Sequence, residues 1–147
     1  MTTPLPPDEQ HRLLGEATRT MLELAPTGWH RIILDYMTLG RRINVGSSAM
    51  VGDGSVVRLA PPRTLAPLFA QLRSGMYAQN TGTWFSFRLI IDPPRTFAVK
   101  YNWNDLPPFP AVPDREHFEI DQERFPRSPE NMPDWFRHGL HGRNERA

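Results

Sequence analysis

The stretch from Gly82 to Pro110 (GTWFSFRLIIDPPRTFAVKYNWNDLPPFP) constrains the fold more than any other part of the chain. Large apolar residues alternate with other residues in two runs, Phe85, Phe87, Leu89 and Ile91, then Phe97, Val99, Tyr101 and Trp103. This period of two predicts two strands, each with a buried and a solvent-facing side, and it places Trp84 on the solvent-facing side. The intervening Asp92–Arg95 (DPPR) predicts a tight turn, because proline fixes φ and lacks the amide donor of a continuing strand. We therefore expect an antiparallel hairpin over residues 83–103.

The preceding part of the chain predicts two helices and a three-strand meander. Apolar residues at three- and four-residue steps predict a helix over residues 8–24, with Asp8 as its N-cap. Residues 29–59 predict three strands, with a hairpin turn at Gly52–Gly54. A second apolar stripe predicts a helix over residues 63–76. The expected fold is therefore a single α+β domain over residues 1–147, with an antiparallel β-sheet of about five strands and helices packed on one face.

Residues 104–140 are expected to form a proline-rich C-terminal tail that docks on this body. Seven prolines fall within residues 104–134: Pro107, Pro108, Pro110, Pro113, Pro126, Pro129 and Pro133. Prolines at this density argue against long regular elements, because each removes a backbone donor and restricts the residue before it. Apolar side chains between the prolines would hold the segment to the body, and Pro133–Leu140 (PDWFRHGL) would add a turn or two of helix.

Length and composition restrict the class of protein. A chain of 147 residues matches one typical domain. The absence of cysteine excludes disulfides, thiol catalysis and cysteine-based zinc sites. No apolar run reaches the roughly 18 residues that a membrane span needs, and the first residues lack the basic and apolar regions of a signal peptide. We therefore expect a cytoplasmic protein that does not engage the membrane.

The charge distribution points to the kind of partner. The whole chain carries a net charge of +1, but residues 104–134 hold eight acidic residues and three arginines, a net charge of −5. An acidic segment on a nearly neutral protein favours a basic protein surface as partner and argues against nucleic acid. The alternative is a solvated loop whose charges only keep the protein in solution.

No motif identifies a catalytic, cofactor-binding or metal-binding site. His138 and His141 have a spacing that would place them on one helical face, but the intervening Gly139 favours two surface histidines. The glycines of Gly52–Gly54 precede a strand rather than a helix, which is not the setting of a dinucleotide-binding loop. We therefore expect a binding protein with no catalytic residues, no cofactor and no metal, rather than an enzyme.

Several short segments together resemble the YezG-like immunity proteins of bacterial polymorphic toxin systems. The matching segments in the first part of the chain are Gly28–Tyr36 (GWHRIILDY), Leu68–Leu72 (LFAQL) and Gly82–Trp84 (GTW). Those in the second part are Phe97–Asp105 (FAVKYNWND), Asp121–Arg127 (DQERFPR) and Pro133–Phe136 (PDWF). Family members commonly end the strand before the tail with an aromatic residue and an aspartate-rich corner. The resemblance spans most of residues 12–140, and the long proline-rich tail departs from it.

The resemblance implies a small cytoplasmic antidote that forms a heterodimer with a cognate secreted toxin and covers its active site. A nuclease is the first expectation for the toxin, because an acidic segment would mimic the phosphates that fill a basic groove, and an NAD-consuming toxin is the second. Charge and position then predict the following partner-binding residues: Trp103, Asp105, Phe109, Glu116, Glu119, Asp121 and Glu123. Trp103 and Phe109 would be apolar anchors, and the alternative for both is an ordinary place in the core.

Two other functions stay open. The first is a small-ligand-binding protein or enzyme on a cone-shaped α+β fold, in which Tyr36, Asp35, His30, Arg88 and Asp92 would converge in a pocket closed by the N-terminal helix. The second is an adaptor or chaperone that binds an extended peptide along a sheet edge. The direction of the polar strand residues would distinguish the first function from an immunity protein, because an enzyme needs several of these residues facing one enclosed pocket.

Overall fold

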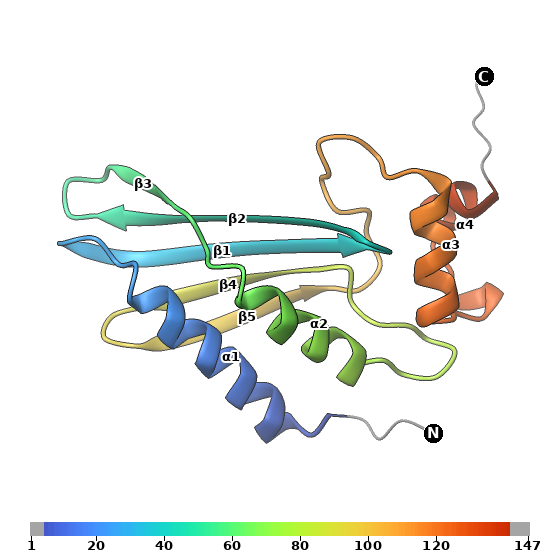
Figure 1. Ribbon diagram of the computed structural model, residues 1–147, viewed down its shortest axis with the longest axis horizontal. Coiled ribbons are helices and arrows are strands. Elements are labelled where there is room, and N and C mark those ends of the chain that lie inside the picture. Colours follow the sequence, from blue (N-terminus) through green and yellow to red (C-terminus); the bar gives the residue numbers. More distant parts are fainter. Residues whose placement is uncertain (1–4, 142–147) are drawn as a thin grey trace.

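A five-stranded antiparallel sheet in the order β3-β2-β1-β4-β5 forms the centre of the computed structural model, which describes residues 5–141. The strands are β1 (Trp29–Leu39), β2 (Arg42–Val51), β3 (Val56–Leu59), β4 (Ser86–Asp92) and β5 (Thr96–Asn102). Helices α1 (Pro7–Leu22) and α2 (Leu65–Gly75) lie side by side over one face of the sheet (Figure 1). This arrangement confirms the predicted α+β class, the antiparallel sheet and the helices on one face.

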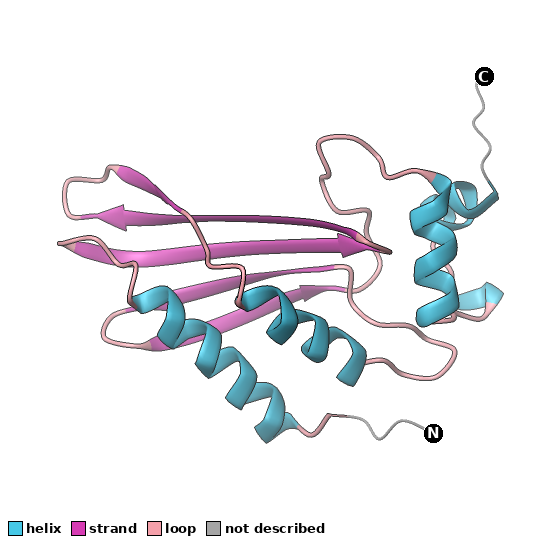
Figure 2. Ribbon diagram, in the orientation of Figure 1, coloured by secondary structure: helices cyan, strands magenta, loops and turns pink. Residues whose placement is uncertain are grey.

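The C-terminal part of the chain adds helical elements at one end of the sheet. They are α3 (Arg115–Arg124), the short 3₁₀ helix η1 (Pro129–Asn131) and α4 (Asp134–His141). Figure 2 shows α3 and α4 beyond the strand ends, separate from the α1–α2 layer. The long loop between β5 and α3 carries several of the prolines of the predicted tail. The predicted proline-rich tail is therefore a loop followed by packed helices.

Helix α1 begins one residue before the predicted cap. Pro6 is the N-cap and Pro7 occupies the first helical position, while Asp8 lies in the first turn without capping it. The predicted cap at Asp8 is therefore wrong. The reason is that proline suits the first helical position, where its fixed φ is already helical and its missing amide has no intrahelical partner to lose. Asp8 and Glu9 instead place negative charge beside the positive end of the helix.

The main core lies between the sheet and the α1–α2 layer. Ile32, Leu34 and Tyr36 of β1 alternate into it, paired across the ladder with Ile91, Leu89 and Phe87 of β4. Tyr36, Phe69 and Phe87 form a group of aromatic rings whose centroids lie 4.9–5.4 Å apart. Offset and edge-to-face ring pairs of this kind add to the stabilisation from apolar burial. The alternation predicted for β4 is confirmed over Phe87, Leu89 and Ile91, all of which are buried.

Trp84 departs from the predicted alternation. The alternation predicts a solvent-facing Trp84, but this side chain is 0% exposed and packs in the main core against Phe87. Regular pairing in β4 begins only at Ser86, so the period of two does not extend back to Trp84. Trp84 and Phe85 are consequently both buried, Trp84 in the main core and Phe85 in a second cluster.

The second cluster fixes the C-terminal helices to the sheet. Leu39, Phe85, Phe118 and Phe136 are its buried members. They come from the end of β1, the residue before β4, α3 and α4. The ring centroids of Phe118 and Phe136 lie 5.5 Å apart, and those of Phe85 and Phe136 lie 5.9 Å apart. An apolar cluster of this size holds α3 and α4 against one end of the sheet.

Candidate functional site

Helix α3 carries the largest share of the predicted partner-binding residues. Residues 114–125 contain no proline, although prolines are frequent on both sides of them. The helix therefore begins directly after Pro113 and the N-cap residue Asp114. The prediction that no long regular element forms within residues 104–134 is therefore wrong. Prolines exclude a helix only where they fall in its interior, and here they lie outside both ends.

The helix divides its side chains between two faces. Phe118 and Asp121 are buried, at 1% and 2% exposure. Glu116, Glu119 and Glu123 follow one another at three- and four-residue steps and are all exposed, so they share the outward face. We call these three glutamates the acidic face of α3.

A buried ion pair fixes the inward face. The guanidinium of Arg73 on α2 donates to both carboxylate oxygens of Asp121, with Nη1–Oδ1 2.6 Å and Nη2–Oδ2 3.1 Å. The two side chains are only 5% and 3% exposed. Arg73 Nε also donates to the carbonyl of Trp84 at 2.7 Å, and the amide of Gly40 donates to Asp121 Oδ1 at 3.0 Å. These contacts join α2, the β1–β2 turn, the entry to β4 and α3 at one point.

A second buried arginine lies next to this pair. Arg127 donates through Nη2 to the carbonyls of Thr83 and Trp103, each at 2.9 Å, and through Nη1 to the carbonyl of Asn131 at 3.1 Å. Its guanidinium lies 4.6 Å from the ring centroid of Phe85. Burial lowers the pKa of Arg127, while backbone carbonyls satisfy its donors in place of a second carboxylate.

The predicted residue Asp121 belongs to this buried cluster and not to a binding surface. At 2% exposure it is inaccessible to a partner, so its assignment as a contact residue is corrected. Arg73 and Arg127 were missed as its neighbours. The available signal was the position of Arg73 four residues after the buried Phe69, on the apolar stripe of α2, where a charged side chain needs a buried partner.

The other predicted residues are distributed over the loop that precedes α3. Trp103 is half-buried and packs against the main core, and Phe109 is half-buried and packs against the second cluster. Both therefore contribute to packing, which is the alternative to a role as apolar anchors in a partner interface. Asp105 is exposed, and its backbone accepts from and donates to the side chain of Asn102, at 2.8 and 2.9 Å.

The carboxylates of the acidic face remain accessible. Glu116 lies 3.4 Å from Arg41 in a pair whose side chains are 65–67% exposed, and Glu119 lies 3.0 Å from Arg115 in a similarly exposed pair. Exposed pairs contribute only about 0–1 kcal/mol, so a partner can replace them at small cost. Within residues 5–141, Glu123 has no ion-pair partner. The face therefore presents three carboxylates on a helix whose other side is fixed.

The face of the sheet that is not covered by α1 and α2 carries two further ion pairs. Arg88 binds both oxygens of Asp35 at 2.8 and 2.9 Å, and Arg31 binds both oxygens of Asp92 at 2.8 and 3.0 Å. The hydrogen bond from Arg31 lowers the pKa of Asp92. All four side chains are 40–53% exposed.

The five residues proposed for an enclosed ligand pocket do not converge. Asp35, Arg88 and Asp92 lie on this open face, whereas Tyr36 points to the other side, into the main core. His30 contacts the carbonyl of Val51 through Nε2 at 3.1 Å near the start of β1. The charged strand residues therefore face outward on the side of the sheet away from the main core, while Tyr36 is buried within that core.

Between residues 5 and 141, no group of three or more His, Asp or Glu side chains is arranged to hold a metal ion. In the same part of the chain, no helix combines the length and apolarity needed to cross a bilayer.

The chain matches no protein-family model, and no curated protein matches it. The resemblance to the YezG-like immunity proteins therefore stays a prediction from the sequence segments quoted above.

Proposed function

We propose that this protein is a cytoplasmic immunity protein that forms a heterodimer with a cognate secreted toxin and covers the active site of that toxin. The observation that carries the proposal is the acidic face of α3, three exposed glutamates on a helix anchored by the buried Arg73–Asp121 pair. A surface that is already rigid loses little conformational freedom when it binds, which favours affinity.

The chemistry of the acidic face favours a toxin with a basic active-site groove. Carboxylates on one helical face would occupy the positions of substrate phosphates, as expected for a nuclease, with an NAD-consuming toxin as the second candidate. Opposite charges at an interface accelerate association, and close pairs add affinity when they are desolvated. The proposed role needs no catalytic group, cofactor or metal in this chain.

The test is co-expression with the toxin-like product of the neighbouring gene, scored by host survival and by co-purification. The triple variant E116R/E119R/E123R should weaken the complex at least about tenfold, because close interfacial charge pairs contribute more than about 1.4 kcal/mol. Association of the unmodified pair should also slow as salt rises, since the Debye length falls from about 10 Å at 0.1 M to about 3 Å at 1 M.

The matched control is E9R/E16R/E23R, which changes the net charge equally on α1 and at its C-cap residue, away from α3 (Figure 1). It should leave survival and complex formation intact. Equal losses in the two triple variants, or no loss in either, would discard the acidic face as the interface. If the unmodified protein gives neither host survival nor a complex with the toxin, the immunity role itself is contradicted.

A further inference from the structure

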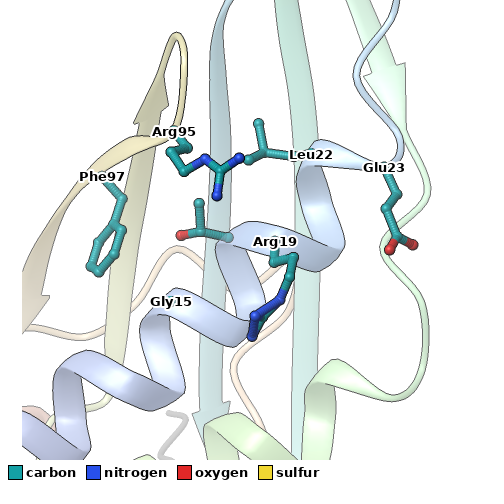
Figure 3. A pocket seen from close by; sticks show the side chains of 7 residues that line it. Gly15, Arg19, Leu22, Glu23, Arg95 and Phe97 are labelled. Atoms are coloured by element: carbon teal, nitrogen blue, oxygen red, sulfur yellow. The ribbon is translucent and has the colours of Figure 1, made fainter.

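A pocket of about 440 Å³ lies between α1 and β5 (Figure 3). It is at the C-terminal end of α1, and Figure 1 shows that this end of the helix is far from α3. Its lining residues are Gly15, Thr18, Arg19, Leu22, Glu23, Arg95 and Phe97. A volume of this size falls in the range of about 300–1,000 Å³ that is usual for small-molecule sites. We call it the α1–β5 pocket.

Gly15 keeps part of this pocket open. It lies in the interior of α1, where glycine is less favourable than alanine. No atom lies within 4 Å of the place that a Cβ would take at Gly15, so packing does not require a glycine here. The space above its Cα is the space of the pocket, and a larger side chain would fill it.

The lining combines apolar surface with positive charge. Leu22 and Phe97 supply the apolar walls. Within residues 5–141, neither Arg19 nor Arg95 has an ion-pair partner. In Figure 3, Arg95 reaches from the β4–β5 turn toward α1, whereas Glu23 points away from Arg95 and Phe97. A ligand held here would meet guanidinium charge at one end and carbon atoms at the other.

Thr18 adds a polar group without a partner. It lines the pocket and is 3% exposed, and its Oγ1 is buried without a hydrogen-bond partner among the described residues. A buried hydroxyl without a partner is unfavourable. Threonine in a helix populates two χ1 rotamers, so this hydroxyl can change direction without a change in the backbone.

We propose that the α1–β5 pocket binds a small amphipathic carboxylate, with its apolar body between Gly15, Leu22 and Phe97 and its carboxylate on Arg95. Charge complementarity selects the anion, because a charge-assisted bond from a guanidinium to a carboxylate is stronger than a neutral one. This inference goes beyond the toxin-binding role and does not depend on it.

The test is a titration of the ¹⁵N-labelled chain alone with octanoate, followed by amide chemical shifts at pH 7. Octanol and octylammonium serve as matched neutral and cationic probes of the same chain length. We expect saturable shifts at Gly15, Thr18, Leu22 and Phe97, with octanoate binding at least about tenfold more tightly than octylammonium. R95Q should weaken octanoate about tenfold and leave octanol unchanged.

G15L separates a filled pocket from a damaged fold. Leucine is a better helix former than glycine, so the variant should melt at or above the temperature of the unmodified chain. Its side chain should abolish the octanoate shifts. Absence of saturable octanoate binding, equal binding of octylammonium, or undiminished binding to a folded G15L would each overturn the proposal. None of these results bears on toxin binding, which is tested with the toxin present.

Discussion

At Asp121, one carboxylate faces two buried guanidinium groups, since it binds Arg73 directly and its charge also acts on Arg127. The D121A variant would leave both arginines buried without a counter-charge. We expect it to lower the free energy of unfolding by about 3–5 kcal/mol, the usual effect of removing one partner of a buried pair. Urea unfolding followed by tryptophan fluorescence measures this.

Glu123 provides the control for this prediction, because it lies two residues further along the same helix and is exposed. The E123A variant should change the free energy of unfolding by no more than about 0.5 kcal/mol. If D121A were as mild as E123A, the buried pair would not be what holds α3 in place.

Tyr101 links burial to the pH dependence of stability. Its hydroxyl oxygen is buried without a partner among the described residues, and burial raises the pKa of Tyr101 to about 12. The folded protein therefore keeps this proton at pH values where the unfolded chain, with a pKa near 10, has lost it. The free energy of unfolding should fall as pH rises from about 10 to about 12, and this contribution is fully present only below pH 10.

The Y101F variant should lose this component of the pH dependence in urea unfolding at a series of alkaline pH values. At pH 7 it should be at least as stable as the unmodified chain, because the buried hydroxyl that it removes has no partner among the described residues. Y77F is the contrasting variant: the hydroxyl of Tyr77 donates to the carbonyl of Pro126 at 2.5 Å, so its loss should lower stability by about 1 kcal/mol. If the free energy of unfolding of Y101F fell between pH 10 and pH 12 as steeply as that of the unmodified chain, Tyr101 would not be the group responsible.

At the scale of elements, two helix glycines have opposite roles. Gly15 in α1 faces open space, whereas a Cβ at Gly139 in α4 would overlap the ring of Phe118 on α3. We expect G15A to raise the free energy of unfolding by about 0.5–1 kcal/mol through helix propensity. G139A should lower it by about 1–3 kcal/mol, because α3 and α4 would have to move apart.

Thermal or urea unfolding of the two single variants measures this difference, and each variant is the control for the other because the substitution is identical. Stabilisation by both would show that α4 packs against α3 less closely than described. Destabilisation by both would show that the space beside Gly15 is already occupied.

The docking of α3 also depends on a turn far away in the sequence. The β1–β2 turn has a positive φ of 61° at Gly40, as a two-residue turn with glycine in its first position requires. A side chain there would overlap the backbone of His117 on α3. The same glycine thus closes the hairpin and lets α3 approach it.

On the scale of the whole molecule, the two proposed sites lie at opposite ends. Helix α3 packs beyond one end of the strands, and the α1–β5 pocket lies near the β4–β5 turn at the other end (Figure 1). The acidic face of α3 attracts cations, and the pocket presents arginines. The two proposals therefore concern different residues and can be tested separately.

The sequence determined the elements that have one buried side and therefore a periodic pattern of apolar residues. The alternation in β4 and the apolar stripes of α1 and α2 each reflect one element with one buried side, so their periods are visible without knowledge of the partner element. Their order along the chain then led to the antiparallel sheet with helices on one face. For α3, the sequence provided the acidic residues but not the helix, because the density of prolines obscured the proline-free stretch between Pro113 and Pro126.

Only the tertiary structure decided which charges are buried. Asp121 and Glu123 are both acidic and lie on the same helix, yet one is 2% exposed and the other is exposed. The difference depends on Arg73, 48 residues away in the chain, and on the β1–β2 turn, whose amide at Gly40 reaches the same carboxylate. A carboxylate is buried only where charge and hydrogen-bond partners from several elements meet, and that meeting is a property of the folded chain.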